Sequence, residues 1–533
     1  MKKKLVLGVL AVLITMTLTL SYTKQEKTVP EHKNTLRLYL QAEPFSLDPR
    51  VGGERRSQML LRELFEGLYR VDESGDPVPA LAKHTIMSPD QTKYTFVLHE
   101  TKWSNGDPVT AYDFEYAWKS NVTPSFVSHY PYAFFIIKNG RKAKLGEVPL
   151  DAVGIKAVNA TTLEVELEHP APYFFDLLAN PLYSPVHKTI ATKNHDWHTK
   201  SGPLYVCNGP FALDTWAHKS EIVLKKNHLY ADAAHVPLAK ISFVIIENPQ
   251  TALHMYERND IDWVGEPFGN LTLESIPTFA KQGRLQTYQL GGMSWFLFNT
   301  TQPLLSSAKI RRALSYAINR NEITRHLLQG GEIPAFSILP KQYTLLDQPL
   351  FQDHDVAQAK YLFEQGLQEL NMTKDTPLVI THWNDPKEKV IAEAVQEQWQ
   401  KTFGIKIQLH SCDWSLYMQK IRTAEFHTLL ANWWSWYRDP IYNLEFIKYR
   451  DSGFNGTRWE NKKYIALLDK SDLERNLEKR KELLKQAEML VIEEMPLAPL
   501  YCQTYKFVKQ PYVKGVYLSP LGQLELKHAS VNK

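Results

Sequence analysis

Residues 36–69 read LRLYLQAEPFSLDPRVGGERRSQMLLRELFEGLY and combine a strand pattern with a helix pattern. From residue 36 to residue 40 leucine alternates with other residues, which predicts a strand that ends at the prolines that follow. Between residues 54 and 69 the large apolar residues fall on one helical face, which predicts a helix. A strand that leads directly into a helix is typical of an α/β fold.

The alternation of strands and helices continues along the rest of the chain. Further strands are predicted at residues 94–98, 163–167, 241–246, 378–380 and 405–409. Helices are predicted at residues 110–118, 310–318, 390–399 and 473–494, and a capping box of Thr110 and Asp113 opens the first of them. No segment repeats, so the sequence predicts an α/β protein without internal repeats.

The length and composition of the chain fit a globular protein with more than one lobe. It has 533 residues, of which 44% are hydrophobic, 23% charged and 12% aromatic. A single hydrophobic core stops growing well below this length, so two or three lobes are expected. The formal net charge is +4 and the basic residues are scattered, which argues against nucleic acid as a partner.

The N-terminus has the features of a secretory signal. Three lysines at positions 2–4 precede an apolar stretch that ends at Leu20 and is short for a bilayer span. A signal peptide over residues 1–22 is therefore predicted, and an uncleaved anchor is the alternative. A lipid anchor requires a cysteine directly after the apolar stretch. Residues 20–23 contain none, so the exported protein is not expected to be a lipoprotein.

The three cysteines, Cys207, Cys412 and Cys502, are too few for a disulfide scaffold. At most one intramolecular disulfide forms, and at least one thiol then stays free or pairs between chains. The alternative is that the cysteines are buried and pack as small apolar residues.

The chain contains no motif that predicts catalysis or metal binding. It lacks a glycine-rich phosphate loop, a nucleophile elbow, paired metal-binding cysteines and a His-Glu-x-x-His helix. His195 and His198 have no third ligand nearby and are interpreted as surface residues. Asp260 and Asp262 fit a loop-to-strand boundary and lack a third group for acid–base chemistry. No catalytic residue, metal or cofactor is predicted, and the chain is not expected to be an enzyme.

Residues 432–440 read NWWSWYRDP and place four aromatic residues within five positions, directly before a turn. One interpretation is a core strand that runs into a turn, which the periodicity alone favours. The other interpretation is the wall of a binding site, because aromatic walls with a few polar groups bury extended ligands.

A set of short motifs runs along most of the chain. In order, they are Ser46-Leu47-Asp48-Pro49, Leu64-Phe65-Glu66-Gly67-Leu68, Trp103-Ser104-Asn105-Gly106, Pro108-Val109-Thr110-Ala111, Asp113-Phe114, Asn208-Gly209-Pro210-Phe211, Arg311-Arg312-Ala313-Leu314 and Asn319-Arg320. Together they resemble the oligopeptide-binding proteins of bacterial ABC importers, within the class of periplasmic peptide- and nickel-binding proteins. Most of them are turns and helix faces, so they identify the fold better than the ligand.

The resemblance implies an α/β, two-lobed periplasmic-binding-protein fold, type II-like and of cluster C, with an additional inserted domain. The expected divisions are lobe I over residues 35–67, 186–291 and 495–533, domain II over residues 68–185, and lobe III over residues 292–494. The ligand is expected between the lobes, and contacts from both lobes favour the closed state. The resemblance also implies a periplasmic monomer that delivers short peptides to inner-membrane permease subunits.

In that family an extended peptide is held like an added strand, with hydrated pockets for varied side chains. Carried over by position, the expected ligand contacts are Gly53, Glu54, Tyr132, Trp433, Trp434, Ser435, Trp436, Asp439, Asn455, Gly456, Thr457 and Tyr501. For each of them a structural role is the alternative, because pocket walls and cores use the same residue types.

Trp436 departs from the family pattern, which has an aspartate here to pair with the α-amino group of the peptide. An indole ring forms no salt bridge, so Asp439 or Glu54 would have to replace the aspartate, or Trp436 would hold the amino group by a cation–π contact. A cell-wall-derived peptide with unusual linkages is therefore a variant of the peptide hypothesis.

Other functions remain open at this point. The same fold accommodates a non-peptide nutrient, such as a metal chelate or a haem-like molecule, in an aromatic cleft. A secreted peptidase or glycosidase needs a nucleophile with a base or two spaced carboxylates, and the sequence indicates neither. A chaperone or an adhesion protein needs an exposed apolar patch.

Overall fold

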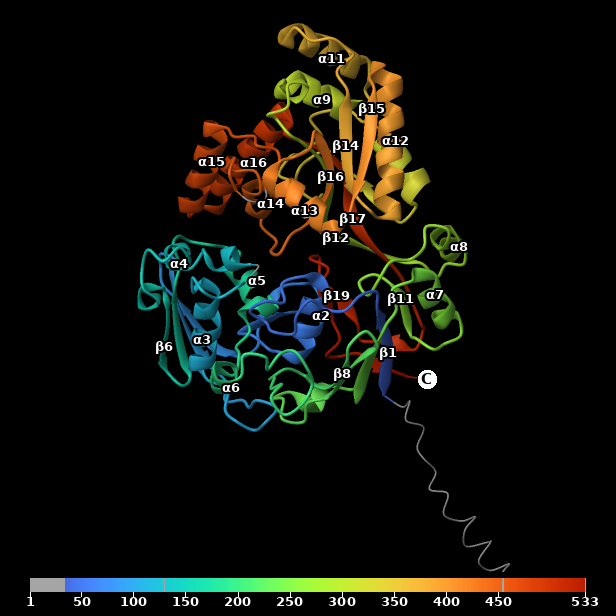
Figure 1. Cartoon of the computed structure of the whole chain (residues 1–533). Helices are drawn as coiled ribbons and strands as arrows, with labels where there is room; N and C mark the ends of the chain where they lie inside the picture. Colours follow the sequence, from blue (N-terminus) through green and yellow to red (C-terminus); the bar gives the residue numbers. More distant parts are fainter. Residues whose placement is uncertain (1–33, 129, 453–454, 533) are drawn as a thin grey trace, which may run out of the picture.

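The computed structural model describes residues 34–128, 130–452 and 455–532, which form an upper and a lower part (Figure 1). The predicted signal peptide, residues 1–22, lies outside the described residues. Strand β17 (Leu497–Lys509) extends from the upper part into the lower part and pairs antiparallel with the equally long β12 (Gln286–Phe298). The two parts are therefore connected through one sheet.

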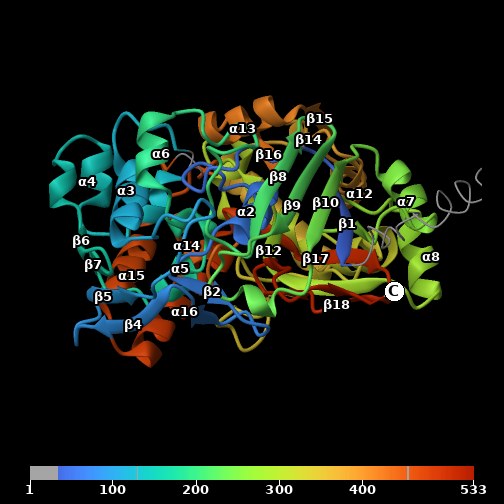
Figure 2. The ribbon, with the colours of Figure 1, turned by 90° about the horizontal axis from the view of Figure 1, so that it is seen from below.

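The lower part contains a four-stranded sheet, which Figure 2 shows from below. Its order is β1 (Thr35–Leu40), β10 (Lys240–Ile245), β9 (Glu221–Lys226) and β8 (Phe211–Ala217). The first two strands run parallel although they are far apart in the sequence, and Leu36 pairs with Ile241. The strands predicted at residues 36–40 and 241–246 are confirmed.

A second four-stranded sheet lies to one side of the lower part (Figure 2). Its order is β4 (Ala82–Met87), β5 (Lys93–Leu98), β7 (Thr162–Glu166) and β6 (Ile155–Asn159), and all its pairs are antiparallel. The helix α3 (Ala111–Val122) packs on β6 and β7. The predicted capping box is present, because the Thr110 N–H donates to the Asp113 carboxylate at 2.9 Å.

The upper part continues the sheet of the two long strands. The order is β11 (Trp263–Gly265), β17, β12, β16 (Thr428–Trp434), β14 (Leu378–Trp383) and β15 (Ile407–Cys412). The helix α12 (Pro386–Phe403) connects the parallel strands β14 and β15, and its Trp399 is buried 5.5 Å from the ring of Phe296. The predicted elements at residues 378–380, 390–399 and 405–409 are confirmed.

The molecule has further helices in both parts. They are α7 (Pro249–Glu257), α8 (Ser275–Lys281), α9 (Ala308–Tyr316), α11 (Val356–Leu370), α13 (Trp414–Thr423) and α14 (Ile441–Glu445).

The helix predicted over residues 54–69 is shorter in the structure, where α2 spans Arg55–Leu64. A distant loop ends it. The side chain of Asn208 accepts from the Glu66 N–H at 3.1 Å and donates to the Glu66 carbonyl at 3.0 Å. Gly209 lies so close that a Cβ would be 2.6 Å from the carbonyl carbon of Leu64. Helix propensity is overruled here by a tertiary contact.

The helix predicted over residues 473–494 begins four residues later in the structure, as α16 (Leu477–Glu494), and Leu473 is the last residue of the preceding helix α15 (Lys462–Leu473). The side chain of Asn476 accepts from the backbone N–H groups of Glu478 and Lys479, which starts α16 at a separate N-cap. The end of α16 before Pro496 is as predicted.

The three cysteines are buried and free, in agreement with their interpretation as small apolar residues. His195 is exposed, and Asp262 lies directly before β11 in an ion pair with Arg37. None of the helices in the described ranges is long and apolar enough to cross a membrane. The division into lobe I, domain II and lobe III stays a prediction.

Candidate ligand-binding site

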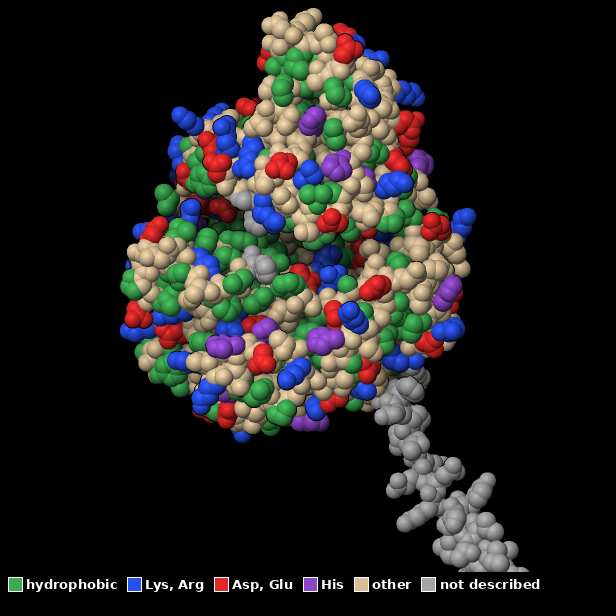
Figure 3. All heavy atoms as spheres, viewed as in Figure 1, with side chains coloured by type: hydrophobic (Ala, Val, Ile, Leu, Met, Phe, Trp, Pro, Cys, Tyr) green, Lys and Arg blue, Asp and Glu red, His purple; other side chains and the backbone are tan. Residues whose placement is uncertain are grey.

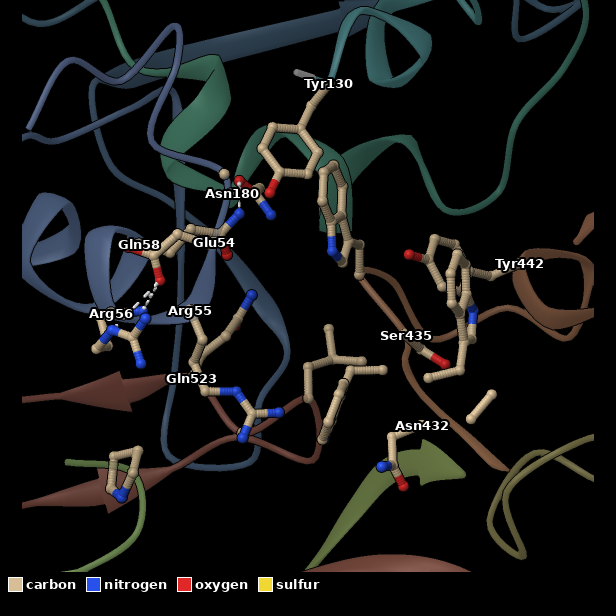
Figure 4. A pocket seen from close by; sticks show the side chains of 18 of the residues that line it. Glu54, Arg55, Arg56, Gln58, Tyr130, Asn180, Asn432, Ser435, Tyr442 and Gln523 are labelled. Carbon is tan, nitrogen blue, oxygen red and sulfur yellow. Dashed lines mark hydrogen bonds and ion pairs between the residues drawn. The ribbon is translucent and has the colours of Figure 1, made fainter. Parts of the chain in front are cut away.

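A cavity of about 620 Å³ lies between the upper and the lower part. Its walls include the start of α2, the segment from Tyr130 into η1 (Pro131–Phe134), the end of β16 with the loop after it, α13, and residues 521–524. On the molecular surface a hollow separates the two parts (Figure 3). In the close-up, residues of α2 lie on one side and Ser435, Asn432 and Tyr442 on the other (Figure 4).

The structure brings most of the predicted ligand contacts to this cavity. Those that line it are Gly53, Glu54, Tyr132, Trp433, Trp434, Ser435 and Trp436. They come from three segments that are far apart in the sequence. Their contact with a ligand stays a prediction.

The other predicted contacts do not line the cavity. They are Asp439, Asn455, Gly456, Thr457 and Tyr501. Asp439 accepts from the guanidinium of Arg480 at 2.7 and 2.9 Å, so its charge is already neutralised and does not replace an aspartate at position 436. Gly456 lies against the ring of Phe426, and Tyr501 is fully buried within β17.

Asn455 and Thr457 hold their own loop together. The Asn455 amide nitrogen donates to the backbone carbonyls of Ile447, Tyr449 and Trp459 at 3.0–3.3 Å. Its amide oxygen accepts from the Thr457 hydroxyl at 2.6 Å. Both side chains are buried with their polar atoms paired, so neither is available to a ligand in this arrangement.

Tyr130, which the sequence analysis missed, lines the cavity beside Gly53. A Cβ on Gly53 would lie 2.1 Å from the Tyr130 ring, so only glycine permits this contact. The Trp436 ring lies 5.0 Å from that of Tyr130 and 5.6 Å from that of Tyr132. Burial first, and then the negative charge of Glu54, raises the pKa of Tyr130 to about 12. These three rings therefore connect the two parts of the molecule through neutral aromatic contacts.

Trp433 and Trp434 fit both interpretations of the aromatic segment, a core strand and the wall of a binding site. Both belong to β16, where they pair with β12, and both also line the cavity. The Trp433 ring packs 4.6 Å from Phe446 and 5.8 Å from Tyr442. The guanidinium of Arg55 lies 4.4 Å from the Trp434 ring. The segment is a sheet strand whose last residues form a cavity wall.

Among the described residues, the charged side chains that line the cavity come from one wall. They are Glu54, Arg55, Arg56 and Arg62, at the start of α2 and within it. Glu54 is the N-cap of α2 and accepts from the Arg56 N–H at 2.7 Å. Arg62 pairs with Glu525 at 3.0 Å. The opposite wall, residues 432–436, carries no charged side chain.

A polar network fixes the side chain of Asn432 in the uncharged wall. Its nitrogen donates to the buried carboxylate of Glu388 at 2.9 Å, and its oxygen accepts from Gln503 at 2.5 Å. Burial raises the pKa of Glu388, and the positive charge of Lys387 opposes this shift. Asn432 is thus bonded at both ends of its amide group.

Several lining residues were not found from the sequence. Arg55 directly follows Gly53 and Glu54, so its position was a usable signal. Trp414 on α13 and residues 521–524 had no signal, because nothing local links them to the other walls.

The chain is similar to known solute-binding proteins over most of its length. A family model described as bacterial extracellular solute-binding proteins, family 5 Middle, matches residues 76–455. The oligopeptide-binding protein OppA of Bacillus subtilis is 39% identical over 504 residues, which cover 93% of this chain and 92% of that protein. The periplasmic murein peptide-binding protein MppA of Escherichia coli is 32% identical over 521 residues, with 94% of each chain covered.

The fold agrees with these similarities. The solved structure of Listeria monocytogenes OppA bound to peptide matches with a TM-score of 0.80 at 26% identity, over 94% of this chain and 100% of that chain. The expected α/β periplasmic-binding-protein fold with two lobes is thereby confirmed. Because the family model covers well over half of its length, the chain belongs to the bacterial extracellular solute-binding proteins of family 5.

Proposed function

We propose that this protein captures short peptides in the cavity between its two parts and delivers them to the permease subunits of an ABC importer. The cavity carries the proposal, because it is large enough for a short peptide and has an aromatic wall opposite a polar one. Relatives that are named as peptide-binding proteins and match over 93% and 94% of this chain support it.

Contacts across the cavity favour a closed arrangement. Besides the rings of Tyr130, Tyr132 and Trp436, the guanidinium of Arg438 donates to Asp76 at 2.7 Å and to Asp176 at 3.0 Å. A peptide that touches both walls adds to these contacts, so binding and closure are one coupled equilibrium. The strands β12 and β17 connect the two parts, and we infer that the hinge lies there.

The proposal includes lobe boundaries and localisation. Lobe I comprises residues 35–67, 186–291 and 495–533, domain II residues 68–185, and lobe III residues 292–494. The basic and apolar N-terminus supports export to the periplasm. We also propose binding without catalysis, because the acidic residue that lines the cavity, Glu54, already caps α2.

A second candidate is a non-peptide nutrient in the same cavity. Trp436 occupies the place where the family has an amino-group partner, and Asp439 pairs with Arg480 instead. An aromatic cavity of this kind also suits a flat ligand without an amino group.

Native mass spectrometry of the purified protein, before and after unfolding and refolding, tests the proposal. We expect bound peptides of mixed sequence before unfolding and renewed binding of added peptides afterwards. A single bound non-peptide mass, with no response to a peptide library in calorimetry, would refute peptide capture and support the second candidate.

A further inference from the structure

Arg55 is a cation in the cavity wall without a counter-charge. Within the part of the chain that the structure describes, its guanidinium forms no ion pair and no side-chain hydrogen bond. It lies instead over the rings of Trp434 at 4.4 Å and Tyr505 at 5.0 Å. Burial raises the pKa of Tyr505 to about 12, so this ring is a neutral phenol that does not neutralise Arg55.

The adjacent acidic residue, Glu54, forms no ion pair with Arg55. One oxygen of Glu54 accepts from the Phe45 N–H at 2.9 Å and the Ser57 N–H at 2.9 Å, and the other accepts from the Arg56 N–H at 2.7 Å. These bonds use Glu54 to cap α2, and they occupy the amides of Arg56 and Ser57 in the first turn of the helix. The cationic character of this wall therefore comes from side chains and not from an open helix terminus.

A second cation strengthens the same wall. Arg56 is half-exposed, and its Nε lies 3.9 Å from Glu54 without a hydrogen bond. Arg62, deeper along α2, is paired with Glu525, yet one of its terminal nitrogens is buried with no hydrogen-bond partner. Gln523 lies on the same side of the cavity as Arg55 (Figure 4) and adds a polar side chain to this wall.

The cavity offers different partners to positive and to negative groups of a ligand. Among the described residues that line the cavity, Glu54 is the anionic side chain, and its oxygens are already bonded to the helix start, so a ligand ammonium group finds no free carboxylate there. A ligand carboxylate meets Arg55, which has no competing partner. Burying a charge without a partner costs several kcal/mol in general, whereas a charge-assisted pair with a guanidinium recovers much of that cost.

We propose that Arg55 receives a carboxylate of the bound peptide, and that the cavity therefore selects anionic peptides over neutral and cationic ones. The carboxylate lies between Arg55 and Arg56, and apolar parts of the same peptide lie among Tyr130, Tyr132 and Trp436. This inference rests on the proposed peptide-binding function and specifies its substrate class. The carboxylate is either an acidic side chain or the C-terminus of the peptide.

Calorimetry with matched peptides tests this selectivity on the full-length protein. The set contains one short peptide with glutamate or glutamine at a given position, each with a free or amidated C-terminus. We expect the most anionic peptide to bind about 10- to 100-fold more tightly than the fully neutralised one. The glutamate-to-glutamine pair measures the side-chain source, and the amidated pair measures the C-terminal source.

Substitution of Arg55 tests the residue. In R55Q we expect the preference for the anionic peptide to disappear while the neutral peptide keeps its affinity within about threefold. In R55K, which keeps the charge, part of the preference returns. R312Q is the matched control, because Arg312 also lies over a tyrosine ring, at 5.6 Å, but outside the cavity. This variant should keep the wild-type preference.

The outcomes separate the two proposals. If neutral and anionic peptides bind the wild-type protein equally, or if R55Q weakens both equally, selection by Arg55 is wrong while peptide capture stands. If no member of the set binds, neutral ones included, peptide capture itself fails. If R55Q does not fold, the wild-type comparison of the four peptides still decides the question.

Discussion

Residues 433–436 and residues 455–457 were both predicted to contact a ligand, but only the first segment lines the cavity. The first segment lines the cavity, whereas the second is buried in its own hydrogen bonds. A hydroxyl side chain does not separate the two segments, since Ser435 lines the cavity whereas Thr457 does not. What separates them is whether the polar atoms already have intramolecular partners and whether the rings face open space.

The largest expected effect is on the second segment. Asn455→Ala removes the donor for three backbone carbonyls and the acceptor for Thr457. We expect the free energy of unfolding to fall by about 3 kcal/mol, because buried carbonyls lose their partners. Urea denaturation measures this change.

The peptide affinity of N455A is expected to stay unchanged, in contrast to its stability. At a temperature where N455A is folded, we expect its affinity for peptides to match that of the wild type. The control Asn194→Ala removes one hydrogen bond at the end of a short helix and should cost less than about 1 kcal/mol. A selective loss of affinity in N455A, at unchanged stability, would contradict a structural role.

The next effect concerns the aromatic wall. Trp436→Asp places a carboxylate in the cavity wall where the ring now contacts Tyr130 and Tyr132. We expect W436D to prefer a peptide with a free α-amino group over its N-acetylated form by about tenfold, from a new charge pair. Calorimetry with the two peptides measures the ratio.

Trp436→Asn is the matched control, because it removes the same ring without adding a charge. Its ratio for the two peptides should stay near that of the wild type. Equal ratios in W436D and W436N would show that position 436 does not lie near the peptide amino group.

A smaller effect is expected on the other wall at Gly53. In Gly53→Ala the new Cβ would lie 2.1 Å from the Tyr130 ring, so this ring must move away from Trp436. We expect the binding free energy of peptides to become less favourable by about 1 kcal/mol. A double-mutant cycle with Tyr130→Ala isolates the cause, since G53A should have little effect once the ring is removed. Additive losses would place the effect elsewhere.

The smallest expected effect is a pH dependence beside Asn432. Burial raises the pKa of Glu388, so the folded state binds its proton more tightly than the unfolded state. The contribution of Glu388 to stability therefore falls as pH rises above its ordinary pKa of about 4.5. Glu388→Gln keeps an acceptor for Asn432 without the charge.

We expect the stability of E388Q relative to the wild type to increase with pH between about 4.5 and 8. Thermal denaturation across this range measures the difference. A constant difference between the two proteins would show that folding does not raise the pKa of Glu388.

Local patterns predicted most of the secondary structure. Alternating residues predicted β5, where burial alternates along the strand, and β1, which the structure buries on both faces, and the capping box marked the start of α3. The helix end at Leu64 was predicted wrongly, because Asn208 and Gly209 hold the chain there from far along the sequence. A local pattern contains no information about such a contact.

The sequence by itself determined the α/β fold, its family and an aromatic segment at residues 432–437, because these depend on residue order within short windows. Only the tertiary structure decided which residues line the cavity. Arg55 lies over Trp434 and Tyr505, and Tyr130 lies on Gly53, through contacts between segments far apart in the chain. The same packing buried Asn455 and Thr457. Burial and hydrogen-bond partners are properties of the folded chain, and they decide whether a side chain is available to a ligand.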